Sequence, residues 1–266
     1  MRKTIRLAGV VLLPVMAMQA QAIEFNILAG GNLWKASPSG YIQGKATESP
    51  LDVKDKLGLS KENQNYFFVQ LDHPIPVIPN LRVSRTALDF TGNNTTAFKF
   101  LDQDFSGDLH TKVDLSHTDV TAYYRFLDGI TTFIPFINLR AELGLTVRQF
   151  DGEFEVEGKT ATSGGKSVTE SISLSAPLPM GYAGLRLGLP LGLSIGANIN
   201  AISYSGNRVS DATADLRYQY DGFPLIKPGL TAGYRSFDVK LDDLKDTYGD
   251  LSFSGAFFGA YLRVGF

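Results

Sequence analysis

Arginine and acidic side chains recur at alternate positions of segments that are otherwise apolar. In NLRAELGLTVRQ, Arg140, Glu142 and Arg148 share one face of an extended strand, and leucine, alanine and valine share the other. A guanidinium binds a carboxylate through two parallel hydrogen bonds, so such residues can cross-link neighbouring strands. The set that we predict on the polar faces is Glu24, Asp119, Arg125, Arg140, Glu142, Arg148, Arg186, Asp215, Arg217, Arg235 and Arg263.

This predicted set contains seven arginines and four acids. Unpaired charges in a confined interior are costly, so we expect ion pairs among them. Two interpretations stay open. The charges form a network that plugs and stiffens the interior, or they line a narrow polar path or a pocket for a small anionic solute, which the excess of arginine attracts.

Histidine chemistry is restricted to His73, His110 and His117. Ser116 and His117 are sequence neighbours, so on a strand they point to opposite faces and cannot form a dyad. His117 and Asp119 share a face, and a serine from another strand would complete a triad, but nothing in the sequence identifies one. We therefore assign no catalytic residue and predict that the protein is not an enzyme. A lipid hydrolase that uses His117 remains an alternative.

One stretch has the spacing of metal ligands. DQDFSGD places Asp102, Asp104, Ser106 and Asp108 as in the first half of an EF-hand loop. The closing glutamate is missing, because the twelfth position is Val113. The chain has no cysteine, which excludes thiolate ligands and disulfides. We predict no metal site and no cofactor.

Strands must position these residues, because period-two alternation recurs along the whole chain, as in NYFFVQLD, DVTAYYRF, LSIGANINAIS and DATADLRYQY. A soluble sandwich buries its apolar face, whereas a membrane barrel turns that face to lipid. The connections favour the barrel, since short turns rich in Pro or Gly alternate with polar, mostly longer loops. The turns are HPIPVIPN, LDGITTFIPF, LGLPLG and DGFPLIKP, and the loops include TGNNTTAFKFLDQDFSG, VEGKTATSGGKSVTE and DDLKDTYGD.

The predicted architecture is an all-β, antiparallel, up-and-down transmembrane barrel of about ten strands, with eight or twelve as alternatives. We interpret residues 36–63 as its first outer loop, in which DVKDKLGLSKE has room for one or two helical turns. The alternation slips within SRTALDF and SAPLPMGYAGL, where we expect bulges. Aromatic girdles are predicted from Tyr123, Tyr124, Phe126, Tyr218, Tyr220 and Phe223. The strands are expected near 23–35, 64–72, 81–91, 109–126, 136–152, 169–187, 193–204, 210–220, 228–240 and 250–266.

The N-terminus has the pattern of a cleavable signal peptide. Basic MRKTIR precedes the apolar run LAGVVLLPVMAM, and AQA supplies small residues at the cleavage site. We predict that residues 1–22 are removed and that residues 23–266 form the barrel domain. The formal charge of −2 becomes more negative without Arg2, Lys3 and Arg6, which is a poor composition for binding nucleic acid.

The C-terminus resembles the signature that closes bacterial outer-membrane barrels. Phe258, Leu262, Val264 and Phe266, together with Ala260, alternate with Tyr261 and Arg263. In that family the signature is read by the periplasmic assembly machinery. The resemblance implies that the alternating apolar set, including Phe266, faces lipid, and that Arg263 and Tyr261 face the lumen.

Two further stretches are similar to a family of proteobacterial outer-membrane barrel proteins with D-L-G-L, H-P-x-P-x-x-P-N-L and L-S-H-T-D segments. They are LDVKDKLGLSKENQNYFFVQLDHPIPVIPNLRV and VDLSHTDVTAYYRFLD, and AISYSGNRVSD also fits. Here the first segment reads KLGL instead of DLGL. The family has a fold assignment and no established activity, so the resemblance implies architecture alone.

The sequence thus predicts a non-enzymatic, monomeric barrel of the bacterial outer membrane, which is either structural or a narrow channel for small solutes, anionic ones among them. Its expected partners are membrane lipid, lipopolysaccharide and, during biogenesis, the barrel assembly machinery. A barrel whose outer loops contact lipopolysaccharide, a host or a phage is the other alternative to the hydrolase.

Overall fold

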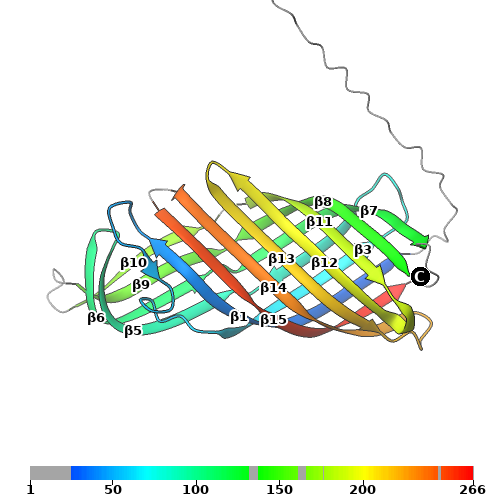
Figure 1. Cartoon of the computed structure of the whole chain (residues 1–266), viewed down its shortest axis with the longest axis horizontal. Coiled ribbons are helices and arrows are strands. Elements are labelled where there is room, and N and C mark those ends of the chain that lie inside the picture. Colours follow the sequence, from blue (N-terminus) through cyan, green and yellow to red (C-terminus); the bar gives the residue numbers. More distant parts are fainter. Residues whose placement is uncertain (1–24, 132–136, 161–165, 176, 245–246, 266) are drawn as a thin grey trace, which may run out of the picture.

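Ten antiparallel strands close into a barrel in the computed structural model, which describes residues 25–131, 137–160, 166–175, 177–244 and 247–265 (Figure 1). Each strand pairs with the next barrel strand along the chain, and the last pairs with the first, so the predicted up-and-down, ten-stranded class is confirmed. The barrel strands are β1 (Asn26–Gln43), β3 (Glu62–Asp72), β4 (Asn80–Thr86), β7 (His117–Thr131), β8 (Asn138–Phe150), β11 (Pro177–Gly188), β12 (Leu193–Tyr204), β13 (Asn207–Gln219), β14 (Ile226–Leu244) and β15 (Thr247–Gly265).

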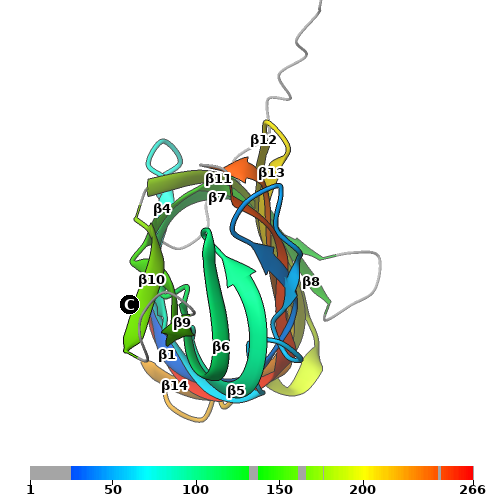
Figure 2. The ribbon, with the colours of Figure 1, turned by 90° about the vertical axis from the view of Figure 1, so that its left-hand side faces the viewer.

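The two ends of the barrel differ. At the turn end, short segments connect the strands, namely residues 73–79, 189–192 and 220–225, and β15 ends there at Gly265. One of these turns holds η1 (Pro190–Gly192), a single 3-10 turn. Among the described residues, no helix is both long and apolar enough to cross a membrane. The opposite, loop end carries the remaining strands, which lie in front in Figure 2.

A second sheet at the loop end corrects the prediction of long polar loops. It is formed by β10 (Ser167–Leu174), β9 (Gly152–Thr160), β6 (Gln103–Asp114) and β5 (Asp89–Phe100) in that order, and we call it the outer sheet. The sequences of these segments are rich in polar residues because one face of the outer sheet is exposed to solvent. Their other face carries alternate apolar residues, such as Phe154 and Val156 on β9, that pack on a core.

The predicted bulges also correspond to the outer sheet. Around Ala87 and Leu88 the chain leaves the barrel wall at the end of β4 and enters β5. Near Ser175 it returns from β10 to β11. The alternation slips there because the chain passes from one sheet to another, so the interpretation as bulges within a continuous strand was wrong.

Residues 36–63 do not form a simple loop. β1 continues to Gln43, and β2 (Leu51–Asp52) pairs back onto it. The DVKDKLGL stretch makes one turn, with Gly58 N–H donating to Lys54 O at 3.0 Å. From this segment Leu51, Val53, Leu57 and Leu59 project into the apolar core.

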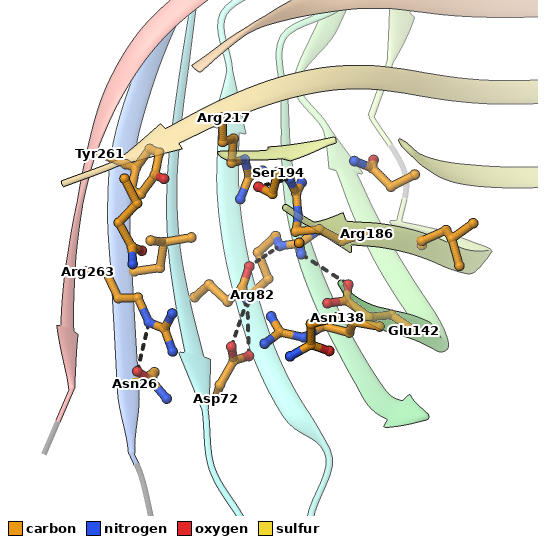
Figure 3. A pocket seen from close by; sticks show the side chains of 18 of the residues that line it. Asn26, Asp72, Arg82, Asn138, Glu142, Arg186, Ser194, Arg217, Tyr261 and Arg263 are labelled. Carbon is orange, nitrogen blue, oxygen red and sulfur yellow. Dashed lines mark hydrogen bonds and ion pairs between the residues drawn. The ribbon is translucent and has the colours of Figure 1, made fainter. Parts of the chain in front are cut away.

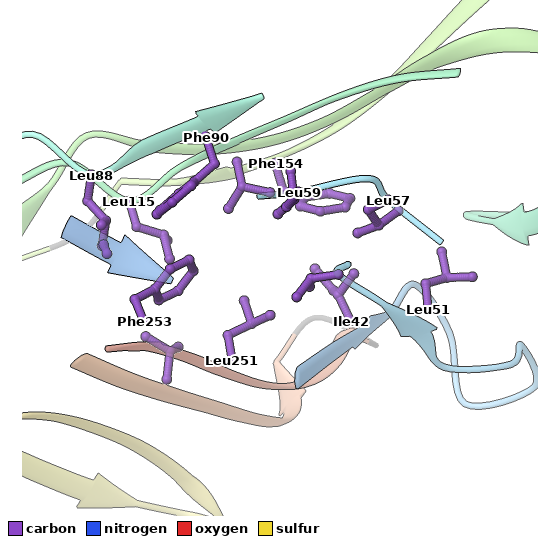
Figure 4. Close-up of a cluster of buried hydrophobic side chains, with 14 of the residues drawn as sticks. Ile42, Leu51, Leu57, Leu59, Leu88, Phe90, Leu115, Phe154, Leu251 and Phe253 are labelled. Atoms are coloured by element: carbon purple, nitrogen blue, oxygen red, sulfur yellow. The ribbon is translucent and has the colours of Figure 1, made fainter. Parts of the chain in front are cut away.

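This apolar core, which we call the outer core, lies between the outer sheet and the extensions of β1, β14 and β15 beyond the barrel (Figure 4). Phe90 and Phe253 stack across it with ring centroids 5.2 Å apart. Both residues are essentially inaccessible to solvent. The loop end is therefore a packed, two-layer sandwich that continues the barrel and has an apolar interior.

The outside of the barrel wall is apolar, and its inside is polar. Leu145 on β8 is 69% exposed and Phe258 on β15 is 64% exposed, although both lie in strand interiors. Such a surface would aggregate in water, and it is the arrangement of a membrane-spanning barrel. We call this outward apolar surface the belt, and it also includes Leu33, Phe67, Val69, Val83, Val120, Leu143, Val147, Leu185, Ile195, Leu216, Leu230 and Leu262.

Candidate functional site

Four charged residues form a central network across the lumen. The register of β7 and β8 places Asp119 directly opposite Arg148, whose Nε and Nη2 each donate to one Asp119 oxygen at 2.7 Å. Arg148 Nη2 also donates to Asp211 at 2.6 Å, and Arg235 donates to both oxygens of Asp211 at 2.8 and 2.6 Å. Carboxylates and guanidiniums alternate, so each buried charge is compensated.

Aromatic rings cover this central network on the side of the loop end. The Arg235 guanidinium lies 4.8 Å from the Trp34 ring centroid, and that of Arg148 lies 5.2 Å from the Phe237 centroid. The Trp34 indole donates to Gly255 O at 3.2 Å, which fixes the ring. Trp34 and Phe237 belong to the outer core, so the charged layer and the apolar layer are in contact. A small cavity of about 70 Å³ remains beside them.

His117 is buried beside the central network. Its Nδ1 donates to Leu115 O at 2.8 Å, which leaves Nε2 to accept from Arg235 Nη2 at 3.4 Å. Among the described residues no serine hydroxyl contacts it, and Ser116 Oγ instead accepts the Leu88 N–H at 3.1 Å. His117 is thus part of the packing around Arg235, with no nucleophile beside it among the residues that the structure describes.

His117, Asp119 and Asp211 also form the one group of potential metal ligands in the described part of the chain, with ligand atoms within 4.8 Å of one another. Both carboxylates are already bound to guanidiniums. Arg148 and Arg235 hold these carboxylate oxygens, and their positive charges oppose the binding of a cation. The trio therefore fits an ion-pair network better than a metal site.

The EF-hand spacing does not produce a site either. Asp104, Ser106 and Asp108 lie on β6, where extended backbone spreads them along the strand. Asp102 occupies the β5–β6 turn and accepts a hydrogen bond from the Lys45 ammonium, which lowers the pKa of its carboxyl. Asp108 accepts from Thr95 Oγ1 at 2.7 Å. These oxygens do not converge on one point.

Between the central network and the turn end, the lumen holds a polar cavity of about 230 Å³, which we call the vestibule (Figure 3). Its lining reaches Asn26, Asn138, Gly188, Gln219 and Arg263, which lie at strand ends on the turn side. Five arginines line it, and the carboxylates that line it are Asp72 and Glu142. The arginines are Arg82, Arg140, Arg186, Arg217 and Arg263.

One carboxylate behind the vestibule wall serves two of these arginines. Arg186 binds Asp215 through both Nη atoms, at 3.0 and 2.9 Å. Arg217 Nε lies 3.0 Å from the same Asp215, but without the alignment of a hydrogen bond. Gly196 makes room for this arrangement, because a Cβ there would lie 2.5 Å from Arg186 Nη2.

Arg82, on β4, donates across the lumen to Tyr182 Oη on β11 at 3.0 Å and to Gln70 Oε1 at 3.1 Å. The Tyr182 hydroxyl in turn donates to Glu142 at 2.6 Å, and Arg82 Nη2 lies 3.5 Å from that carboxylate. These groups form a hydrogen-bonded chain that holds the Arg82 guanidinium at the cavity surface.

Tyr123 belongs to this interior and not to an interfacial girdle, which corrects its predicted placement. Its ring is inaccessible to solvent, and its hydroxyl donates to Asp72. Arg125 lies 3.4 Å from the same carboxylate. The neighbouring Tyr124 does face outward, where its hydroxyl donates to Val77 O at 3.0 Å.

The residues predicted for the lumen all lie inside the barrel in the described ranges: Asp119, Arg148 and Arg235 in the central network, and Arg125, Arg140, Glu142, Arg186, Asp215, Arg217 and Arg263 in or beside the vestibule. Glu24 and Phe266 lie outside the described residues. Phe258 and Leu262 are exposed on the belt, Val264 is half-buried beside them, and Tyr261 and Arg263 line the vestibule.

Sequence reasoning missed Asp72, Arg82, Tyr182 and Asp211. Asp211 was recognisable, because it precedes Asp215 by four residues and shares its face. Arg82 alternates with Leu81 and Val83 in the same manner. Asp72 and Tyr182 had weaker signals, since one ends its strand and the other is an aromatic residue on the polar face.

The sequence matches no protein-family model and no curated protein sequence. Among solved structures, the outer membrane protease OmpT from Escherichia coli is 10% identical, with a TM-score of 0.42 over 91% of this chain and 97% of that one. Ail, the attachment invasion locus protein of Yersinia pestis, is 12% identical, with a TM-score of 0.32 over 91% and 99%. Neisserial surface protein A is 13% identical, with a TM-score of 0.26 over 90% and 96%. These TM-scores say nothing about the activity of this chain.

Proposed function

We propose that this chain is a non-enzymatic β-barrel of the bacterial outer membrane with a structural role, closed to the passage of solutes. The observation that carries the proposal is that the central network and the outer core pack the interior between the vestibule and the loop end with buried side chains. A pore would need a continuous aqueous path, and these two buried layers oppose one.

The apolar belt supports the location in a bilayer, and the predicted signal peptide and C-terminal signature favour the outer membrane. In that orientation the turn end faces the periplasm and the outer sheet faces the exterior. The belt would contact membrane lipid, the rim of the outer sheet would lie among lipopolysaccharide, and the assembly machinery would read β15. We expect a monomer, because the strands of the barrel leave no unpaired edge.

Reconstitution tests the structural role against the channel. Purified protein in planar bilayers should give a flat current trace at moderate voltage. Discrete, weakly anion-selective steps in the wild type would overturn the proposed closure. Fractionation should recover the protein with outer membranes, and a water-soluble species would contradict the location.

A surface-binding barrel is a second candidate, and the outer sheet favours it. Its four strands pack on the outer core and form an ordered platform beyond the belt, which loops without secondary structure would not provide. Binding of lipopolysaccharide micelles to the purified protein, compared with a variant that replaces exposed Lys54 and Lys56 by Gln, would test it.

The geometry gives the hydrolase no support. H117A should leave any measured lipase or esterase background unchanged, because His117 contacts Arg235 and a backbone carbonyl. The hydrolase would become the better candidate if the wild type had esterase activity and if H117A abolished that activity while it still folded.

A further inference from the structure

We propose that the vestibule is a binding site for a small multivalent anion that carries phosphate or carboxylate groups and enters from the turn end. Arg217, Arg186 and Arg82 would hold it. This inference goes beyond the structural role proposed above and concerns a part of the lumen that the central network leaves empty of side chains.

Charge is the first argument. Asp215 lies behind the wall and is shared by Arg186 and Arg217. Two guanidiniums on one carboxylate leave an excess of positive charge at this part of the wall, within a low-dielectric barrel where such an excess is poorly screened. A bound polyanion would relieve this repulsion.

Arg217 supplies the second argument. In the described part of the chain it makes no hydrogen bond, and its polar contact is the ion pair with Asp215. Its guanidinium lies over the Tyr261 ring at 5.8 Å, which orients it. Guanidinium donors without acceptors in a concave site are suited to phosphate or carboxylate oxygens.

The size and the access of the cavity define the ligand class. A volume of about 230 Å³ suits an anion of pyrophosphate or citrate size with a few waters, since a water occupies roughly 30 Å³. The neutral donors Asn26, Asn138 and Ser194 complete the lining toward the turn end. The central network blocks the other side, so ligand would enter from the periplasm.

Calorimetric titration of the full mature chain in detergent at low ionic strength tests the site, with pyrophosphate and citrate as probes and chloride as a monovalent control. We expect saturable binding of pyrophosphate, citrate or both, and none of chloride. Which polyanion binds more tightly distinguishes phosphate from carboxylate recognition. The measurement does not depend on membrane conductance, so its failure is distinct from failure of the proposed function.

R217Q should weaken polyanion binding by at least about tenfold. G196A retains every charge but moves the Arg186 guanidinium, and it should weaken binding several-fold. R208Q is the matched control, because it removes the same charge from an exposed position near the loop end and should change affinity less than about twofold. Gel mobility before and after heating verifies that each variant folds. No saturable binding to wild type, or equal losses in R217Q and R208Q, would overturn the site.

Discussion

Asp211 accepts hydrogen bonds from two guanidiniums, and its carboxylate is what allows Arg148 and Arg235 to be buried together. Asn at this position keeps the shape but removes the charge. D211N should reduce the free energy of unfolding by about 3–5 kcal/mol, because two buried cations lose their shared partner. Urea unfolding in lipid vesicles, followed by tryptophan fluorescence, measures the change.

The control for this variant is the exposed Arg85–Asp151 pair, whose charged groups lie 3.0 Å apart. D151N should cost no more than about 1 kcal/mol, since water screens the pair. Equal effects of D211N and D151N would show that the central network contributes little beyond surface charge.

Which arginines face the lumen could be predicted from the sequence, but which partners they bind could not. Alternation assigns Arg148 and Arg217 to the inner face whatever the register. It does not show that Arg148 reaches Asp211 on β13, because that contact crosses the lumen and depends on the tilt and closure of ten strands. For the same reason the sharing of Asp215 by two arginines was not foreseeable.

The two faces of β15 contact different surroundings, the outer core on one side and lipid on the other. Phe253 packs in the outer core against Phe90 and Phe237, whereas Phe258 lies on the belt. F253A should lower stability by about 3–5 kcal/mol, because it leaves a cavity between two packed layers. F258A should cost clearly less, since lipid refills the space. Equilibrium unfolding of both variants makes the comparison, and a larger loss in F258A would contradict the assignment of faces.

The elements of the barrel wall were predictable, and those of the outer sheet were not. Wall strands such as β8 and β12 show long uninterrupted alternation because lipid selects one face along their whole length. On β5 and β6 polar residues such as Asn94 and Asp104 obscure the pattern, since water covers one face and the hairpin tip. Polarity alone therefore does not separate a loop from a strand above the membrane.

At the scale of the whole molecule, the belt predicts how a charged substitution on the outer surface changes the stability of the inserted barrel. Leu143 lies at the middle of the outward residues of β8 and is 55% exposed. L143R should destabilise the inserted barrel by about 2–4 kcal/mol, because a cation at the bilayer midplane is costly. Tyr204, at the tip of the β12–β13 hairpin, is 79% exposed, and Y204R should cost at most about 1 kcal/mol.

Folding into vesicles of increasing acyl length, with fractions read from heat-dependent gel mobility, measures both variants. The difference between L143R and Y204R should grow as the bilayer thickens. A difference that does not depend on acyl length would place the membrane elsewhere on the barrel.

The seam between β1 and β15 joins strands from opposite ends of the chain, with Trp34 and Gly255 hydrogen-bonded across 221 positions. Until β1 and β15 pair, the sheet has two unpaired edge strands and encloses no lumen. We therefore expect ring closure to be the pairing step with the largest loop-closure entropy. A molecule halted before it would present unpaired barrel edges on β1 and β15 to envelope proteases and chaperones, whereas the closed barrel pairs both of these edges.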